Sequence, residues 1–216
     1  MSRFQPEDLS AAEIARQQEL YGPFTQAVRE LVDATLRTTL EGDVIGEAQA
    51  QVEAVTARLR EQQIEGAYGV HYSHEGRGRA WGNAVIGLRN AIAPPLSITT
   101  DADQRAVADF HLGAVYEGPP GLVHGGVVSL VLDQILGHAV GASGRPGMTG
   151  TLTIVYRQGT PLGGLRAEAW IDRSAGVKTF AKGHIIGPDG VTAEAEGVFV
   201  LPRWARSLTD APDIGN

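Results

Sequence analysis

A glycine-rich turn that leads directly into an apolar run constrains this 216-residue chain more than any other feature. The turn is the Gly-Pro-Pro-Gly segment 118–121, the triplet His-Gly-Gly follows at 124–126, and the apolar run extends to residue 139. This order of residues indicates a tight loop that opens into a buried helix. The run is interrupted by one acidic residue, Asp133, and an aspartate among apolar neighbours is expected to have a partner or a chemical task.

The glycines at the start of the predicted helix indicate a binding site for a negative oxygen. Gly125 and Gly126 let a ligand approach the unpaired backbone N–H groups, and the positive end of the helix dipole favours a developing negative charge. This is the arrangement of an oxyanion hole. Asp133 follows Gly125 by eight residues, which is roughly 12 Å along a helix, so one copy cannot easily bring both groups to one carbonyl. Two antiparallel helices across a dimer interface can, and the dimer then carries two equivalent composite sites.

Composition narrows the class of protein. The chain has no cysteine, which excludes disulfides, a thiol nucleophile and cysteine metal sites, and which fits a cytoplasmic protein. We find neither ~18 consecutive apolar residues nor a charged and then apolar leader, so we expect a soluble protein without a membrane partner. Residues 1–66 carry 12 acidic residues and 6 arginines, whereas residues 67–216 are nearly balanced. This acidic N-terminal region disfavours nucleic acid as a partner.

Residues 1–66 predict an N-terminal helical extension. A capping-box pattern at Ser10–Glu13 starts a first helix, which we expect to break at Gly22-Pro23. A second helix is predicted from Phe24 to Leu40 and a third from about Val44 to Gln63. The third helix carries apolar residues at alternating spacings of three and four, a narrow seam suited to packing on another helix or on the main domain. The seam consists of Ile45, Ala48, Val52, Val55 and Leu59. A packing role is favoured, and a lid or binding role stays open.

Residues 67–82 predict a linker or flap between the extension and the main domain. They contain His71 and His74, which could suggest a metal site. The surrounding glycines favour a loop, however, and no cysteine is present to assist, so we expect no metal site. At the other end of the chain, the polar tail 206–216 is expected to fray.

The main domain is predicted at residues 83–205, where the hydrophobic period changes to two. Strands are expected at 85–88, 96–100, 105–115, 151–157, 165–172, 177–186 and 191–201. The Gly-Pro-Asp-Gly segment 187–190 is a strong hairpin signal between the last two strands. A strand, a buried helix and then a meander of strands indicate an α+β fold with an antiparallel sheet on one central helix.

Three features of the main domain together carry a family resemblance. They are the nine-residue segment 118–126, the acidic residue nine positions after its histidine, and Met148-Thr149 before an alternating strand that ends in Tyr156-Arg157. They resemble the hotdog-fold acyl-CoA thioesterases of the PaaI-like (phenylacetate) group, over roughly residues 83–203. The resemblance implies a hotdog fold, hydrolysis of an acyl-CoA to a free acid and coenzyme A, and a homodimer that can pair into a homotetramer. It implies no cofactor beyond the coenzyme A of the substrate.

The resemblance also implies a role for individual residues. The Gly125 backbone N–H polarises the thioester carbonyl, and Asp133 of the partner subunit is the nucleophile or the general base. Thr149 places that aspartate or the attacking water. His124 orders the loop, in preference to acting as the base. Gly118 departs from the pattern, because several members of the group carry a polar residue there, often asparagine, and a possible second hydrogen-bond donor is lost.

Binding residues complete the expected site. Gly126 adjoins the oxyanion hole, and Arg145, Arg157, Lys178 and Lys182 are candidates for the phosphates of coenzyme A at its mouth. Solvated strand ends are an equally good interpretation of these four cations.

Alternative functions stay open at this point. A non-catalytic acyl-CoA or lipid-binding hotdog protein is motivated by Gly118, and Asp133 would then only satisfy a helix-entrance N–H across the dimer. A ligand-sensing repressor is disfavoured by the acidic N-terminal region. A hydratase or dehydratase is disfavoured because the helix lacks a paired Asp and His in one short motif. Ser129 lacks a Gly-x-Ser-x-Gly setting, which disfavours a serine hydrolase.

Overall fold

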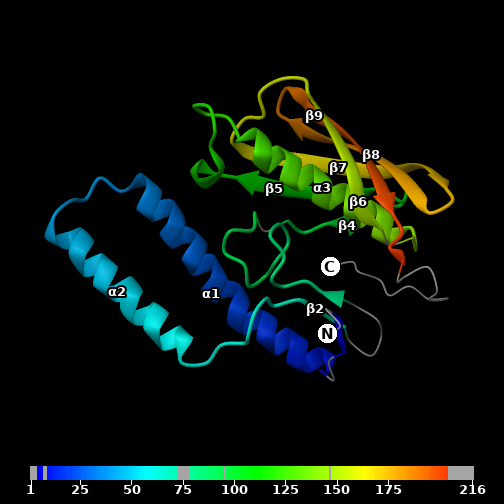
Figure 1. Cartoon of the computed structure of the whole chain (residues 1–216). Helices are drawn as coiled ribbons and strands as arrows, with labels where there is room; N and C mark the ends of the chain where they lie inside the picture. Colours follow the sequence, from blue (N-terminus) through cyan, green and yellow to red (C-terminus); the bar gives the residue numbers. More distant parts are fainter. Residues whose placement is uncertain (1–3, 7–8, 73–77, 95, 146, 204–216) are drawn as a thin grey trace.

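The computed structural model describes residues 4–6, 9–72, 78–94, 96–145 and 147–203 and shows a helical arm beside a body of sheet and helix (Figure 1). The arm, residues 11–60, consists of α1 (Ala11–Arg37) and α2 (Asp43–Arg60). The body contains α3 (Gly125–Ala142), the 3-10 helix η1 (Ala114–Tyr116) and an antiparallel sheet with the strand order β4 (Thr99–Thr100), β5 (Ala106–Leu112), β7 (Gly163–Ala175), β8 (Lys178–Gly187), β9 (Gly190–Val200) and β6 (Met148–Tyr156). A small second sheet joins β1 (Phe4–Pro6), β2 (Val70–Tyr72) and β3 (Gly78–Arg79). The predicted α+β class, with an antiparallel sheet on one central helix, is confirmed.

Helix α3 lies across one face of the main sheet and forms the centre of the core (Figure 1). Its buried side chains pack chiefly against β7 and β8. Two glycines on adjacent strands, Gly183 and Gly197, let Leu136 approach the sheet closely, since an added Cβ would lie 3.0 Å and 2.9 Å from its methyl carbons. Among the described helices α3 alone is long and apolar enough to cross a membrane by composition. Its position in the core accounts for that apolar character.

The strand predictions hold for the second half of the chain, and before β5 the short strand β4 lies within the segment expected at 96–100. The hairpin at residues 187–190 joins β8 to β9 as expected. The strand expected at 85–88 is wrong, because the carboxamide oxygen of Asn83 accepts hydrogen bonds from the backbone N–H groups of Val85 (2.7 Å) and Ile86 (3.1 Å). This side chain holds the segment in consecutive turns. The side chain of Val85 is nevertheless buried, so its apolar character reflects burial without a strand.

Strand β6 contains a β-bulge at its beginning. Thr149 pairs with Phe199 of β9, whereas Thr151 pairs with Val198, so Gly150 is an extra residue in the ladder. Strand β6 also lies at one edge of the main sheet and pairs only with β9 there. The bulge therefore changes which face of the sheet the first residues of β6 occupy.

Helix α1 runs without interruption through Pro23, so the break expected at Gly22-Pro23 is wrong. Proline removes one N–H donor from the helix, but packing of the two preceding residues on the body holds the segment helical. Gly22 lies against Leu88, and the guanidinium of Arg89 stacks on the ring of Tyr21 at 3.7 Å from the ring centre. Tertiary contacts thus outweigh the local preference for a break.

One arginine fastens α1 to the body. The Arg29 guanidinium donates hydrogen bonds to the backbone carbonyls of Ala93 (3.2 Å), Asn90 (3.0 Å) and Gly87 (3.4 Å). Burial lowers the pKa of Arg29, but hydrogen bonds to three carbonyl acceptors stabilise the charged guanidinium. The α1 helix also contacts η1, which directly precedes the glycine-rich loop.

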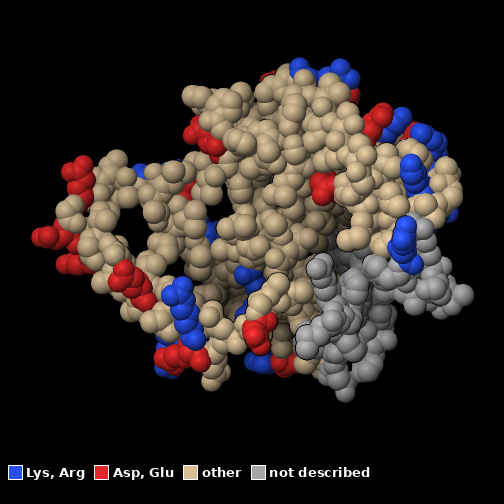
Figure 2. All heavy atoms as spheres, viewed as in Figure 1, with Lys and Arg blue, Asp and Glu red and all other residues tan. Residues whose placement is uncertain are grey.

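Helix α2 has no comparable anchor. It spans the segment where the third helix was predicted, and none of its residues is buried. Figure 2 shows the arm projecting from the body with open space beside α2.

The boundaries expected for the extension, linker, main domain and tail stay a prediction. Both His74 and the tail 206–216 lie outside the described residues. His71 lies in β2, where its Nε2 is 2.8 Å from the carbonyl oxygen of Tyr68. Within the part of the chain that the structure describes, no group of three or more His, Cys, Asp or Glu residues is placed to hold a metal ion.

Candidate active site

The glycine-rich loop before α3 is closed by its own hydrogen bonds. The Gly118 N–H donates to the Leu122 carbonyl at 2.9 Å, and the Gly121 N–H donates to the Glu117 carboxylate at 2.6 Å. Gly121 has a φ of 74°, a conformation that glycine adopts without strain. At the end of the loop, the N–H of His124 donates to the carbonyl of Tyr116 at 2.9 Å. The sequence of this loop thus fixes where α3 begins.

Gly118 makes the closest approach within this loop. An added Cβ would lie 2.7 Å from the Cα and 3.1 Å from the Cβ of His124. Contacts this short with backbone cannot be relieved by a rotamer change. The loop geometry therefore has no room for the polar side chain that resembling proteins carry at position 118.

His124 caps α3, and it leaves one glycine N–H available. Its Nδ1 accepts a hydrogen bond from the Gly126 N–H at 2.9 Å, which requires that this ring nitrogen carry no proton. Among the described residues none accepts a hydrogen bond from the Gly125 N–H. Gly125 therefore keeps an unpaired donor at the positive end of the helix, whereas Gly126 uses its own donor for the cap.

Two hydroxyl groups hold the carbonyl of the same glycine. Tyr156 and Ser129 each donate to the Gly125 carbonyl oxygen at 2.9 Å, and their hydroxyl oxygens are 2.8 Å apart. The peptide between Gly125 and Gly126 is thus held at its oxygen by these hydroxyls and at its N–H by His124. Because both ends of this peptide plane are held, the backbone of Gly125 rotates less. Its own N–H, which is free, therefore keeps one direction.

Tyr156 and Ser129 were not predicted as site residues. Tyr156 ends the alternating strand β6 and pairs with Ala193 of β9, so it shares the face of the sheet that carries α3. The signal for Ser129 is its spacing of four residues from Gly125, which permits a side-chain hydrogen bond to the helix carbonyl. Neither pattern indicates a catalytic role without the three-dimensional contact.

The expected contact between Asp133 and Thr149 is present within one chain. The Thr149 hydroxyl donates to the Asp133 carboxylate at 2.8 Å. The Asp133 side chain is half-buried on α3, and Thr149 is exposed on the edge strand β6. This bond orients one carboxylate oxygen and leaves the other with no described partner.

The β-bulge makes this contact geometrically possible. Residues that alternate along β6 after the bulge, such as Thr151 and Thr153, pair with Val198 and Glu196 and lie on the face away from α3. Simple alternation would place Thr149 on that outer face. The extra residue Gly150 shifts it to the inner face, where it reaches Asp133.

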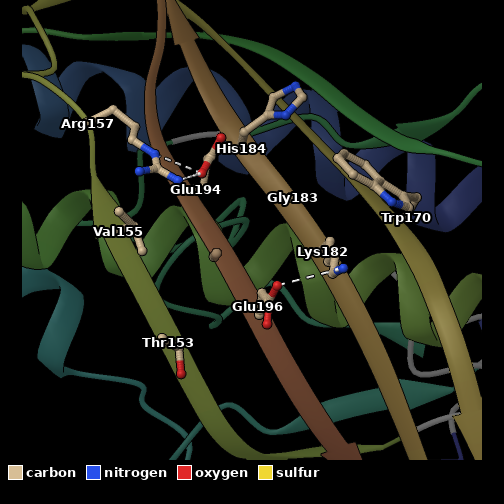
Figure 3. Close-up of a pocket in the computed structure, with 10 residues that line it drawn as sticks. Thr153, Val155, Arg157, Trp170, Lys182, Gly183, His184, Glu194 and Glu196 are labelled. Carbon is tan, nitrogen blue, oxygen red and sulfur yellow. Dashed lines mark hydrogen bonds and ion pairs between the residues drawn. The ribbon is translucent and has the colours of Figure 1, made fainter.

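The four cations predicted to bind coenzyme A phosphates do not gather near Gly125 within one chain. Arg157 forms two hydrogen bonds to Glu194 (2.9 Å and 2.6 Å), and Lys182 lies 3.2 Å from Asp172 and 3.7 Å from Glu196. Figure 3 shows these two cations, with Trp170 and His184, around a depression of about 480 Å³ on the outer face of the sheet.

The other two cations lie near the opposite end of α3. Arg145 donates to the carbonyl of Gly176 at 2.6 Å. Lys178 is exposed at the start of β8. Their role in binding phosphates stays a prediction.

Comparison with known proteins gives both partial and full-length similarity. A scan against models of protein families found no match. Two curated acyl-coenzyme A thioesterases named THEM4 are similar to part of the chain: the one from Xenopus laevis is 30% identical over 102 residues, 46% of each chain, and the one from Bos taurus is 31% identical over 110 residues, 50% of this chain and 45% of its own. The chain thus spans about half the length of these curated relatives.

A solved structure extends the similarity to almost the whole molecule. This crystal structure, described as a thioesterase superfamily protein, is 32% identical with a TM-score of 0.76, and the match covers 91% of this chain and 94% of the other. The expected hotdog fold is thereby confirmed, together with the helical region before it. Identity at this level over nearly the full length of both chains shows that the chain belongs to the thioesterase superfamily.

Proposed function

We propose that this protein is an acyl-CoA thioesterase that hydrolyses a thioester to a free acid and coenzyme A. The observation that carries the proposal is the unpaired Gly125 N–H at the start of the helix that also presents Asp133, oriented by Thr149. An unpaired helix N–H stabilises a developing oxyanion, and a positioned carboxylate activates water or attacks a carbonyl. The names of the two partial relatives support the same class of reaction.

A second copy completes the proposed site. Gly125 and Asp133 lie eight residues apart on one straight helix, roughly 12 Å, so they cannot both reach one carbonyl group within a chain. Strand β6 is an edge strand on which Met148, Val155 and Tyr156 are exposed. Pairing of two such edges would bring the antiparallel helices together. The Gly125 N–H would then face Asp133 of the partner subunit.

The chemistry follows from these groups. In the general-base route, the carboxylate takes a proton from water, the hydroxide attacks the thioester carbon, and the oxyanion is stabilised by the Gly125 N–H. The carbon–sulfur bond then breaks, and coenzyme A leaves as a thiolate that is protonated by solvent. In the nucleophile route, the carboxylate oxygen attacks first and forms an anhydride that water then hydrolyses. A thiolate is a good leaving group, so neither route needs a catalytic triad.

The decisive experiment replaces the carboxylate. Asp133→Asn is expected to lower kcat by about 10²–10⁴-fold, because the amide can neither accept the proton nor attack. Thiol release from acetyl-, medium-chain, long-chain and aryl-CoA esters is followed with a thiol reagent, and the chain has no cysteine to react with it. Asp109→Asn, which removes an exposed carboxylate on β5, is the matched control. Parental activity in Asp133→Asn would refute the assignment.

A free acid without label after a single turnover in ¹⁸O-labelled water demonstrates the nucleophile route, whereas a labelled acid also forms when water attacks the acyl carbon of the anhydride. The general-base route places the label in the free acid during the first turnover. The nucleophile route delivers an unlabelled oxygen from the enzyme carboxylate when water attacks the carboxylate carbon. This measurement requires only the active parent protein.

A non-catalytic acyl-CoA-binding protein is the second candidate, and the close approach of Gly118 to His124 favours it. The site then has one fewer donor than resembling proteins have. Saturable binding across the same acyl-CoA panel without thiol release would select this function.

A further inference from the structure

The turns at residues 87–93 connect α1 with η1, the 3-10 helix that leads into the glycine-rich loop. On one side, the Arg29 guanidinium of α1 donates hydrogen bonds to three backbone carbonyls of these turns. The acceptors are the carbonyls of Gly87, Asn90 and Ala93. On the other side, the Tyr116 hydroxyl of η1 donates to the Ile92 carbonyl at 3.4 Å. Helix α1 also contacts η1 directly. The position of Tyr116 therefore depends on where α1 holds the turns.

The turns at 87–93 are held at more than one place. The planar guanidinium of Arg29 fixes its three acceptors in one relative geometry, and hydrogen bonds from a charged donor are stronger than those between neutral groups. The Gly87 N–H donates to the Asn83 carbonyl at 3.1 Å, and the Asn83 carboxamide donates to the Gln134 side chain of α3 at 3.3 Å. The turns are thus tied to α1, to η1 and, through Asn83, to the core helix.

Tyr116 carries this connection into the candidate oxyanion hole. Its backbone carbonyl accepts the hydrogen bond from the His124 N–H at 2.9 Å. His124 caps α3, and the next residue, Gly125, has the unpaired N–H. Burial raises the pKa of the Tyr116 hydroxyl, so this hydroxyl remains a donor at neutral pH. A displacement of Tyr116 would move His124 and change the direction of the Gly125 N–H.

Helix α1 contributes little to the hydrophobic core. Thr25 is the one buried residue among its 27, so burial on this helix adds little to stability. The hydrogen bonds of Arg29 and the stacking of Arg89 on Tyr21 instead determine where the helix lies on the body. These contacts favour a role in positioning over a role in core packing.

We propose that α1 positions the oxyanion hole, and that Arg29 is a positioning residue that acts through the turns at 87–93 and Tyr116. This inference rests on the proposed function, because it assigns the helix a part in stabilising the oxyanion. The arm then supports catalysis without contacting the substrate. Orientation at this accuracy matters, since a misplacement of about 1 Å caused far from the chemistry can cost about 10²-fold in rate.

Hydrogen–deuterium exchange tests the connection without reference to activity. In Arg29→Met, which removes the donors and keeps a long side chain, the amides of residues 116–126 are expected to exchange roughly tenfold faster than in the parent, whereas β7 and β8 keep their parental rates. Arg37→Met is the matched control, because Arg37 lies on the same helix and pairs with Asp33 there at 3.0 Å. Parental exchange of residues 116–126 in Arg29→Met, or an equal rise in β7 and β8, would overturn the inference.

Steady-state kinetics tests the consequence for the reaction. Arg29→Met is expected to lower kcat about tenfold and to change KM by less than about twofold, because the oxyanion forms only after the substrate is bound. Arg29→Lys retains a charged donor and should recover part of the lost kcat. Assays run well below the thermal midpoint of every variant, so that all are fully folded. A parental kcat in Arg29→Met, or a loss confined to KM, would contradict the positioning role.

The two experiments keep this inference separate from the proposed function. A parent protein that releases no thiol from any acyl-CoA would refute the proposed function, and the exchange rates would still decide whether Arg29 is connected to the loop. An active parent together with an Arg29→Met variant of parental kcat and parental exchange would overturn this inference alone.

Discussion

Gly118 shows how one missing side chain determines the shape of the loop around the candidate oxyanion hole. We predict that Gly118→Asn, which restores the residue of resembling proteins, lowers the free energy of unfolding by about 1–3 kcal/mol and lowers activity. The reason is that the new Cβ would lie 2.7 Å from the Cα of His124. Thermal unfolding and thiol release provide the measurements.

Gly113→Ala is the control for this substitution, because an added Cβ there meets nothing within 4 Å. An asparagine variant that is as stable as the parent and more active would show that the loop accommodates the side chain. In that case the missing donor, and not the close approach, would explain the glycine.

Among the individual residues, those with a distinctive chemical group in an unusual setting could be predicted from the sequence. Residues that matter only because of where they lie in the fold could not. Asp133 stood out as an aspartate in an apolar run, and its contact with Thr149 followed from the family resemblance. Tyr156 and Ser129 gave no such signal, because a tyrosine at a strand end and a serine in a helix are common. Their importance arises only where they converge on one carbonyl oxygen.

At the element scale, Pro23 is the point where local preference and tertiary packing conflict. We predict that Pro23→Ala raises the free energy of unfolding by roughly 1–3 kcal/mol, because alanine restores a backbone donor in the middle of α1. Chemical denaturation followed by circular dichroism measures the change. Pro188→Ala, in the turn between β8 and β9, should give no gain. A lower stability of Pro23→Ala would mean that the proline itself contributes to the packing of α1 on the body.

The same conflict explains which elements could be predicted. The alternating strands β7, β8 and β9 and the seam of α2 have a strong period, and the structure contains elements at these places. The expected strand at 85–88 and the expected break in α1 rested on short local patterns. A single side chain, Asn83, overrides the first, and packing against the body overrides the second.

At the scale of the whole molecule, the proposed catalytic site requires a second copy at the β6 edge. We predict that the thermal midpoint rises with protein concentration, because an assembly binds the folded state alone. Each tenfold dilution lowers the stability of a dimer by about 1.4 kcal/mol. Calorimetry over a hundredfold range of concentration measures the slope. A midpoint independent of concentration would show a monomer, and with it an incomplete catalytic site.

The surfaces through which two copies would meet could not be predicted from the sequence. The α+β class could be derived from the residue pattern of one chain, and the separation of Gly125 from Asp133 is the reason for proposing a partner subunit. Which surfaces meet depends on what the folded chain leaves uncovered. The sequence pattern of α2 was compatible with packing on another helix or on the main domain, and the folded chain buries none of its residues.

The extra residue in β6 determines which face of the sheet each residue before it occupies. Gly150 reverses the alternation between Thr149 and the residues that follow. Deleting it would restore regular pairing with β9 and turn the threonine away from Asp133. Insertion of one more residue would have the same effect. The number of residues in β6 upstream of residue 151 therefore decides whether Thr149 reaches Asp133.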